Sequence, residues 1–455
     1  MITTEETVIE TTSLEETLAE TFWPVLIRAR KDAYVVWGTQ VTIDYKIKVD
    51  EKELAEIARY YSNKHGISEN DKKILETIAL NGMGKDVELP KFQGDMLKSE
   101  IEAILKKKCE LNLLNSKECK EEIGGSPAIS AIASYFLQDK NPGKAVAKTK
   151  YFGTYPKSVE EYVQKEINKS GEKNNAENLE KWQKIDELLS NGVKNEKFPA
   201  TLSFECGKYK LMLANSEGRD LKDLEGKLNF PETDRPLVAI GGLNKGKPDE
   251  YLSLIEKIRE KNAYVFVGTN SFEGKMRARD IETMEGYVKI LREADIVSMN
   301  EAELDQIHEA LYGKREISRA QKLEQLGING LAAVHSSGGV IFHMGVSIKK
   351  ESKNSIEGIL KLSVDATSYY FEKGEQFSKF EEIRDYREDL RRNKIDYLTI
   401  FGNNHNILNA GDAVAPFVNH EIAKGSITGL GAMFDGYICA LIAPVFHFFK
   451  KREKK

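Results

Sequence analysis

The stretch Asp295-Ile-Val-Ser-Met-Asn-Glu-Ala-Glu-Leu304 joins a short apolar run directly to the start of a helical pattern. The same alternation of strand and helix runs through the chain from Arg235 onward. It predicts strands at 237–241, 263–267, 296–299 and 331–335, and helices at 249–261, 280–292, 301–311 and 317–325. Such alternation is typical of an α/β fold with a mostly parallel sheet and helices on both faces. Ligands of such sheets bind beyond the carboxyl ends of the strands.

Earlier regions of the chain predict a second, smaller sheet. Residues 33–49 begin as an apolar run and end in alternation, which indicates a buried strand followed by a half-exposed one, with Asp44 where they meet. Residues 200–213 alternate as a one-sided antiparallel sheet should. Residues 144–155 predict another strand and 159–196 a polar helical segment. At 455 residues the chain is long enough for a large lobe and a smaller one.

Charge and composition exclude several classes of protein. The chain has 67 Lys and Arg against 72 Asp and Glu, a net charge of −5, scattered along its length, so nucleic acid is not an expected partner. Four cysteines without metal-ligand spacing favour a reducing compartment. Residues 1–20 do not resemble a secretory signal, and the longest apolar stretch, 437–449, is shorter than the roughly 20 residues of a membrane span. We therefore expect a cytoplasmic protein that binds no membrane.

The stretch Ile407-Leu-Asn-Ala-Gly-Asp-Ala-Val-Ala-Pro-Phe417 predicts a turn followed by the opening of a helix with an acid at its start. Free NH groups and the helix dipole at such a point attract phosphate oxygens. Asp412 beside them can take a proton from an attacking hydroxyl. The structural alternative is that this turn only caps a helix.

A second candidate site lies at Gly124-Gly125, which precede a predicted helix with Pro127 in its first turn. That helix start predicts an anion or hydroxyl site, and the alternative is tight packing of the helix on a sheet. A third candidate is the pair Asn300 and Glu303, which lie three residues apart on one helix face and can order water around Mg²⁺ beside nucleotide phosphates. Its alternative is a helix cap at Asn300 and a solvated acid at Glu303.

The segments 298–304 and 409–412 resemble the NxxE and GxGD motifs of the ribokinase-like superfamily. The order of the features resembles more closely the archaeal ADP-dependent glucokinase and phosphofructokinase family, over roughly residues 33 to 449. This resemblance implies a ribokinase-like three-layer large domain with a mostly parallel sheet and a smaller α+β lid domain. The implied large domain comprises residues 1–42, 94–150 and 220–455, and the implied lid comprises 43–93 and 151–219.

The resemblance also implies an activity, namely transfer of the β-phosphoryl group of ADP to a sugar or sugar phosphate of the glucose or fructose 6-phosphate type, with release of AMP. The implied partners are ADP, the acceptor and Mg²⁺, and the protein is expected to be a monomer or a small homo-oligomer. Asp412 would be the base, with Gly411 and Ala410 holding the phosphoryl group. The implied remaining roles are sugar binding by Asp44, Glu88, Gly124 and Gly125, nucleotide binding by Asn300, His335 and Asn409, and the metal at Glu303.

The chain departs from the family pattern in several places. Asn409 replaces the first glycine of GxGD, and acids expected near 267–271 and after His335 are missing. Two alternative functions therefore remain open. One is an ATP-dependent ribokinase-like sugar or nucleoside kinase, and the other is a non-catalytic sugar or nucleotide sensor on the same fold.

Overall fold

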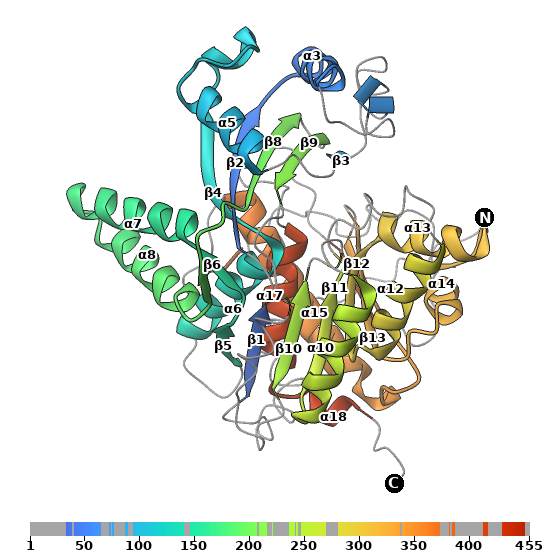
Figure 1. Ribbon diagram of the computed structural model, residues 1–455. Coiled ribbons are helices and arrows are strands. Elements are labelled where there is room, and N and C mark those ends of the chain that lie inside the picture. The colour runs from blue at the N-terminus through green and yellow to red at the C-terminus, as the bar shows by residue number, and fades with distance from the viewer. Residues whose placement is uncertain are drawn as a thin grey trace, which may run out of the picture.

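An eight-stranded sheet forms the centre of the protein, in the order β15-β14-β13-β12-β11-β10-β1-β5 (Figure 1). The computed structural model describes residues 33–38, 41–64, 72–73, 75–76, 87–89, 94–140, 146–206, 209–215, 221, 236–241, 243, 247–269, 281–336, 339–373, 382, 385–386, 413–416 and 430–450. None of the described helices is long and apolar enough to cross a membrane.

Six neighbouring strands of this sheet are parallel, as predicted. They are β5 (Lys148–Tyr151), β1 (Tyr34–Gly38), β10 (Leu237–Gly241), β11 (Tyr264–Gly268), β12 (Ile296–Asn300) and β13 (Leu331–Ser336). The sheet continues antiparallel with β14 (Gly339–Met344) and β15 (Ala413–Pro416). Successive side chains of each parallel strand point to opposite faces, so an apolar run without alternation forms a strand buried on both sides.

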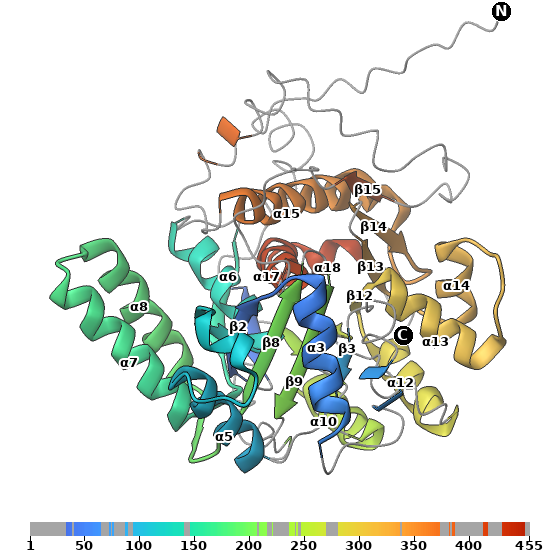
Figure 2. The same cartoon turned by 90° about the horizontal axis from the view of Figure 1, so that it is seen from above.

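Helices cover both faces of the sheet and give three layers (Figure 2). One face packs against α10 (Pro248–Glu260), α12 (Ile281–Glu293), α13 (Glu301–Tyr312) and α14 (Arg319–Gln325). The other packs against α6 (Ser126–Lys140), α15 (Lys353–Lys373), which follows the short η4 (Lys350–Ser352), α17 (Leu430–Ile442) and α18 (Phe446–Phe449). Val36 and Val238 enter the first core, whereas Val35 and Leu237 enter the second. The three-layer α/β prediction is therefore confirmed.

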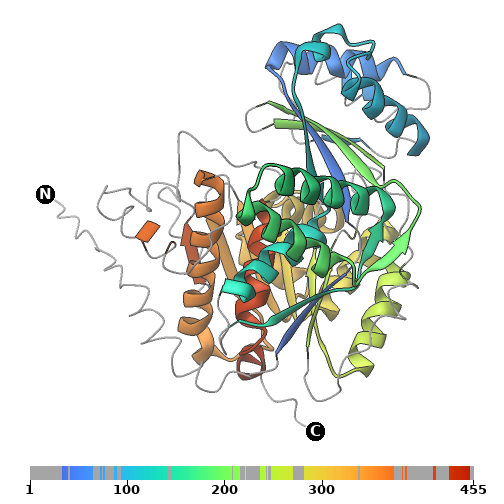
Figure 3. The ribbon, with the colours of Figure 1, turned by 90° about the vertical axis from the view of Figure 1, so that its left-hand side faces the viewer.

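A five-stranded sheet stands above the large one (Figures 1 and 3). Its strands, in spatial order, are β3 (Val87–Leu89), β9 (Tyr209–Asn215), β8 (Ala200–Cys206), β2 (Thr42–Lys48) and β4 (Cys119–Gly124). It is mixed rather than antiparallel, because β2 pairs with β8, and β3 with β9, in parallel. The predicted half-exposure of the second strand is wrong, since β2 is buried from Thr42 to Ile47. Its outer side packs against α3 (Glu51–Ser62) and α5 (Gly94–Leu105), the latter followed by η2 (Asn112–Ser116).

The chain boundaries of the two lobes differ from those expected. Helix α5 and strand β4 belong to the small sheet, although residues 94–124 were expected in the large domain. The helical hairpin α7 (Lys157–Glu172) and α8 (Ala176–Leu189) was expected in the lid, but it adds no strand to the small sheet and extends to one side (Figure 1). The hairpin is joined at its base by the parallel pair β6 (Thr154–Pro156) and β7 (Val193–Asn195). Sequence alternation identified the small sheet but not which helices pack on it.

Candidate functional site

The carboxyl ends of the parallel strands bring several predicted residues together. Asn300 ends β12 and pairs in register with His335 of β13, while Gly268 at the end of β11 pairs with Ser298. Thr269 follows β11 directly and donates from its backbone NH to the Ser298 carbonyl, at 3.0 Å. This edge is where ligands of open parallel sheets bind.

The start of α13 is closed by its own side chains. Asn300 Oδ1 accepts from the NH of Glu303 at 2.7 Å, and Glu303 Oε2 accepts from the NH of Asn300 at 2.9 Å. The same Glu303 oxygen accepts from Thr269 Oγ1 at 2.5 Å, and Glu303 is only 2% exposed. This reciprocal arrangement is a capping box. The capping alternative for Asn300 is thus confirmed, and the alternative of a solvated acid at Glu303 is wrong.

The surroundings of Glu303 do not fit direct coordination of Mg²⁺. Oε2 already accepts two hydrogen bonds, and Mg²⁺ requires carboxylate oxygens or waters in octahedral positions around it. Within the described segments no group of three His, Cys, Asp or Glu side chains could hold a metal ion. Mg²⁺ remains a prediction.

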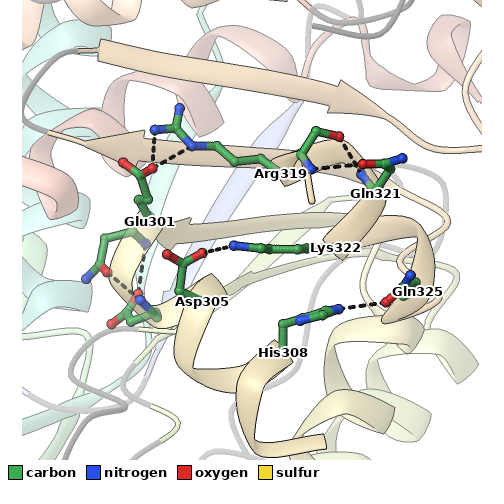
Figure 4. Close-up of polar contacts among 10 residues, drawn as sticks. Glu301, Asp305, His308, Arg319, Gln321, Lys322 and Gln325 are labelled. Carbon is green, nitrogen blue, oxygen red and sulfur yellow. Dashed lines mark hydrogen bonds and ion pairs between the residues drawn. The ribbon is translucent and has the colours of Figure 1, made fainter. Parts of the chain in front are cut away.

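Polar side-chain contacts hold α13 against α14, on the outer side of α13 (Figure 4). Arg319 Nε donates to Glu301 Oε1 at 2.9 Å, and Lys322 Nζ contacts Asp305 Oδ1 at 2.6 Å. His308 Nε2 lies 2.7 Å from Gln325 Oε1. These contacts fix the helix whose first turn carries Asn300 and Glu303.

His335 packs against the start of α17. A Cβ atom added at Gly431 would lie 3.0 Å from Cε1 of His335, so glycine allows this close approach. The ring of Phe434 lies near the imidazole, with ring centroids 6.3 Å apart. Burial lowers the pKa of His335 to about 4, so the imidazole is neutral at pH 7. A nucleotide-binding role for His335 stays a prediction.

Asp44 lies against the start of α6. A Cβ atom added at Gly124 would be 1.9 Å from Asp44 Oδ1, which means that only glycine leaves room for this carboxylate. Thr42 Oγ1 donates to the same oxygen at 3.0 Å. Gly125 has a φ of +85°, a left-handed conformation suited to glycine, and α6 begins at Ser126. Three of the predicted sugar-binding residues, Asp44, Gly124 and Gly125, are therefore neighbours in space.

The starts of α6 and α17 lie side by side. Ser130 Oγ in the second turn of α6 donates to the Ala432 carbonyl in the first turn of α17, at 2.6 Å. Further along, a Cβ atom added at Gly436 would lie 2.4 Å from the Ser130 carbonyl oxygen. The first-turn NH groups of both helices thus open toward one region, at the junction of the two lobes.

The remaining predicted residues are only partly described. Glu88 lies in β3, the strand at one end of the small sheet, with its backbone paired to Met212. Asn409, Ala410, Gly411 and Asp412 lie outside the described residues, so their roles stay predictions. The helix predicted to open at Asp412 is wrong, because Ala413–Pro416 form β15. Through β14, Ala413 aligns with Ala333, three residues before Ser336 at the carboxyl edge.

Sequence reasoning missed another Gly-x-Gly segment, Gly429-Leu-Gly431-Ala432, whose last three residues are the first three of α17. The signal was present, since two glycines precede an apolar helical run. Ala432 stands where the GxGD pattern has its acid. The acid of this helix is Asp435, which is 2% exposed, and its Oδ1 has no hydrogen-bond partner among the described residues.

Asp435 is buried beside β12. Burial raises its pKa to about 8, the Ser298 hydroxyl opposes that rise, and the charge of Glu303 adds to it. The carboxyl is therefore largely protonated at pH 7. It lies close enough to the capping box of α13 for the charge of Glu303 to act on it.

The chain is similar in structure to several solved proteins. No family model and no curated protein matches the chain. A hypothetical ADP-dependent phosphofructokinase from Pyrococcus horikoshii OT3 is 12% identical, with a TM-score of 0.54 over 92% of this chain and 100% of that one. An ADP-dependent kinase complex with fructose-6-phosphate and ADPbetaS is 13% identical, with a TM-score of 0.58 over 95% and 98%. A phosphofructokinase from Pyrococcus horikoshii OT3 with AMP is 11% identical, with a TM-score of 0.53 over 91% and 98%.

These structures match nearly the full length of both chains while sharing few identical residues. The similarity therefore concerns the fold, including the small lobe that extends from the carboxyl edge of the large sheet. The chain therefore has the two-lobed fold of these phosphofructokinase and ADP-dependent kinase structures, with a sequence that shares few residues with theirs.

Proposed function

We propose that the protein is a sugar kinase that transfers the β-phosphoryl group of ADP to a sugar hydroxyl and releases AMP. One observation carries this proposal: the starts of α6 and α17 lie side by side, and the Asp44 carboxylate occupies the first of them. A donor of phosphate and an acceptor hydroxyl can then meet between two sets of free NH groups.

Each helix start has its own role in the proposal. Asp44 accepts a hydrogen bond from an acceptor hydroxyl, and Gly124 gives its carboxylate the room to do so. The start of α17, with no carboxylate in its described first turn, attracts the transferring phosphoryl group. Asn300, His335 and Asn409 are assigned to the nucleotide, and Mg²⁺ enters with the phosphates.

ADP is proposed as the donor because the similar solved structures include complexes with ADPbetaS and with AMP. The ATP-dependent alternative shares every described feature of the site. A direct comparison of the two nucleotides is therefore part of the test.

The proposal also needs a proton acceptor. Asp412 is the predicted base, and Asp435 is the acid of the described helix α17. In the protonated form that burial favours, Asp435 cannot accept a proton. The proposal therefore keeps Asp412 as the base.

A second candidate function is a non-catalytic sugar or nucleotide sensor. The observation that favours it is Ala432, because it follows a Gly-x-Gly sequence where the GxGD pattern has its acid, and α17 carries no acid in its first turn. Such a site binds phosphate and sugar but does not activate the hydroxyl.

Coupled assays of ADP and ATP against a panel of sugars and sugar phosphates separate these functions. A kinase gives AMP and a phosphorylated sugar, with Asp412→Asn lowering turnover by about 10²-fold to 10⁴-fold while nucleotide still binds in calorimetry. Full turnover in Asp412→Asn contradicts the assigned base. Sugar and nucleotide binding without any turnover supports the sensor.

A further inference from the structure

One face of the small sheet is polar and turns toward the large lobe. Asp44 and Lys46 lie on this face of β2, and Glu122 on β4 pairs in register with Asp44. Ser203 on β8 pairs in register with Lys46. Lys46 and Asp44 are 8% and 5% exposed, so charged groups here have left most of their water. Ionic groups that are nearly buried need partners.

Lys46 has such a partner in Glu122. Its Nζ lies 2.8 Å from Glu122 Oε2. Burial lowers the pKa of Lys46, but the charges of Glu122 and Asp44 outweigh it and leave the pKa raised. Burial likewise raises the pKa of Glu122, but Lys46 and Lys120 together outweigh it and leave the pKa lowered. Both groups are therefore charged at neutral pH, and the charge of Lys46 is balanced within the protein.

Two further groups belong to this face. Ser203 is 1% exposed and its hydroxyl has no hydrogen-bond partner among the described residues. A buried hydroxyl without a partner indicates a missing polar group. Burial raises the pKa of Tyr370 on α15, and the nearby charge of Glu122 raises it further. The polar face thus has α15 of the large lobe as a neighbour and extends the surface on which Asp44 lies.

The net charge of this polar face determines which ligand fits it. Asp44 and Lys46, which are buried, and Glu122, whose side chain is 23% exposed, sum to −1 − 1 + 1 = −1. Lys120 also contacts Glu122, but its side chain is 71% exposed and water screens it. Among the described residues of this face, a phosphate, which carries about −1.5 to −2 charges, would meet two carboxylates and no buried cation without a partner. Hydroxyl groups can instead donate to the carboxylates and pair with Ser203.

We propose that the acceptor is a neutral sugar rather than a sugar phosphate, and that Glu122 sets this preference by balancing the charge of Lys46. The inference rests on the proposed function for the location of the acceptor. It assigns to the small lobe the discrimination between acceptors, while the large lobe binds the nucleotide.

The test is calorimetric binding of glucose, fructose and their 6-phosphates to the full chain with AMP present. The expected result is that at least one neutral sugar binds ten-fold or more tightly than its 6-phosphate. Glu122→Gln removes the charge that balances Lys46, so the ratio of neutral-sugar affinity to 6-phosphate affinity should fall ten-fold. Glu121→Gln is the matched control, because Glu121 pairs with Lys165 at 2.9 Å on the opposite face of β4 and should leave the ratio unchanged.

Equal or tighter binding of a 6-phosphate by the unaltered protein overturns the inference, as does binding of none of the four sugars. The comparison in the unaltered protein requires no variant to fold. An unchanged ratio in a folded Glu122→Gln refutes the role of Glu122. Binding of a neutral sugar without phosphoryl transfer refutes the kinase proposal but supports the neutral acceptor, so the two failures are distinguishable.

Discussion

The starts of α6 and α17 are adjacent but differ in what occupies them. At α6 a carboxylate, Asp44, comes from the small lobe and lies against Gly124. At α17 the described first turn carries no acid, and Asp435 lies deeper, buried beside Ser298. In the proposed function the same helix field serves two purposes: a carboxylate at one start favours hydroxyl donors, and a described first turn without an acid favours phosphate.

The largest expected effect concerns Asp435. Its pKa is raised on folding, so the folded state keeps a proton that the unfolded chain has lost above about pH 4. Stability should therefore fall as pH rises from about 4 to 8, by at most about 1.4 kcal/mol per pH unit from this group. Asp435→Asn should remove that component, and urea unfolding at several pH values measures it. An identical pH dependence in both proteins contradicts a buried neutral acid.

The next effect concerns the carboxylate at α6. Gly124→Ala places a Cβ atom 1.9 Å from Asp44 Oδ1 and should displace it. Sugar affinity should drop about 100-fold, or about 2.7 kcal/mol, while nucleotide affinity persists. Gly171→Ala in α7 is the control, because an added Cβ there meets nothing within 4 Å. Unchanged sugar affinity in Gly124→Ala removes Asp44 from the acceptor site.

A smaller effect is expected at the capping box of α13, which borders the α17 site. Thr269→Val removes the hydroxyl that donates to Glu303 Oε2. Loss of a hydrogen bond to a charged group should cost about 1.5 to 3 kcal/mol of unfolding free energy. Denaturant unfolding measures this loss of unfolding free energy. Glu303→Gln should cost less unfolding free energy in the Thr269→Val protein than in the unaltered protein. Additive effects of the two changes would show that the groups do not interact.

The smallest effect is expected at the outer contacts of α13. Lys322→Ala removes the partner of Asp305, whose side chain is 48% exposed. Partly exposed ion pairs contribute little, so stability should change by less than about 1 kcal/mol. Thermal unfolding with and without 0.5 M salt checks this. A larger loss of stability would show that the contact with α14 is needed to hold α13 in place.

Periodicity predicted the large sheet well because its strands and helices alternate within a short span of chain. Residues 237–241 and 263–267 are apolar runs, and both faces of the strands they form are buried. The small sheet was harder, since β4 is polar in sequence, Cys-Lys-Glu-Glu-Ile-Gly, and owes its place to pairing with β2. No local pattern in β4 reveals a partner about 70 positions earlier.

The site was partly predictable for the same reason. Gly124-Gly125 and Asn300 to Glu303 are local signals, and each lies at a helix start in the structure. Whether Glu303 faces water or Thr269 depends on a neighbouring strand, which spacing cannot show. The sequence at 409–412 matched the GxGD motif better than that at 429–432 did, because it contains the acid, yet a described helix begins within the latter, at Leu430.

The interleaving of the two sheets along the chain has a consequence for synthesis. By residue 215 the ribosome has released every strand of the small sheet, but only β1 and β5 of the large one. Strand β1 then presents an unpaired edge until β10 emerges, which is a site for mispairing between nascent chains. Helix α17 follows every described strand, so the proposed phosphate end of the site forms only after the strands of the proposed acceptor end have been synthesised.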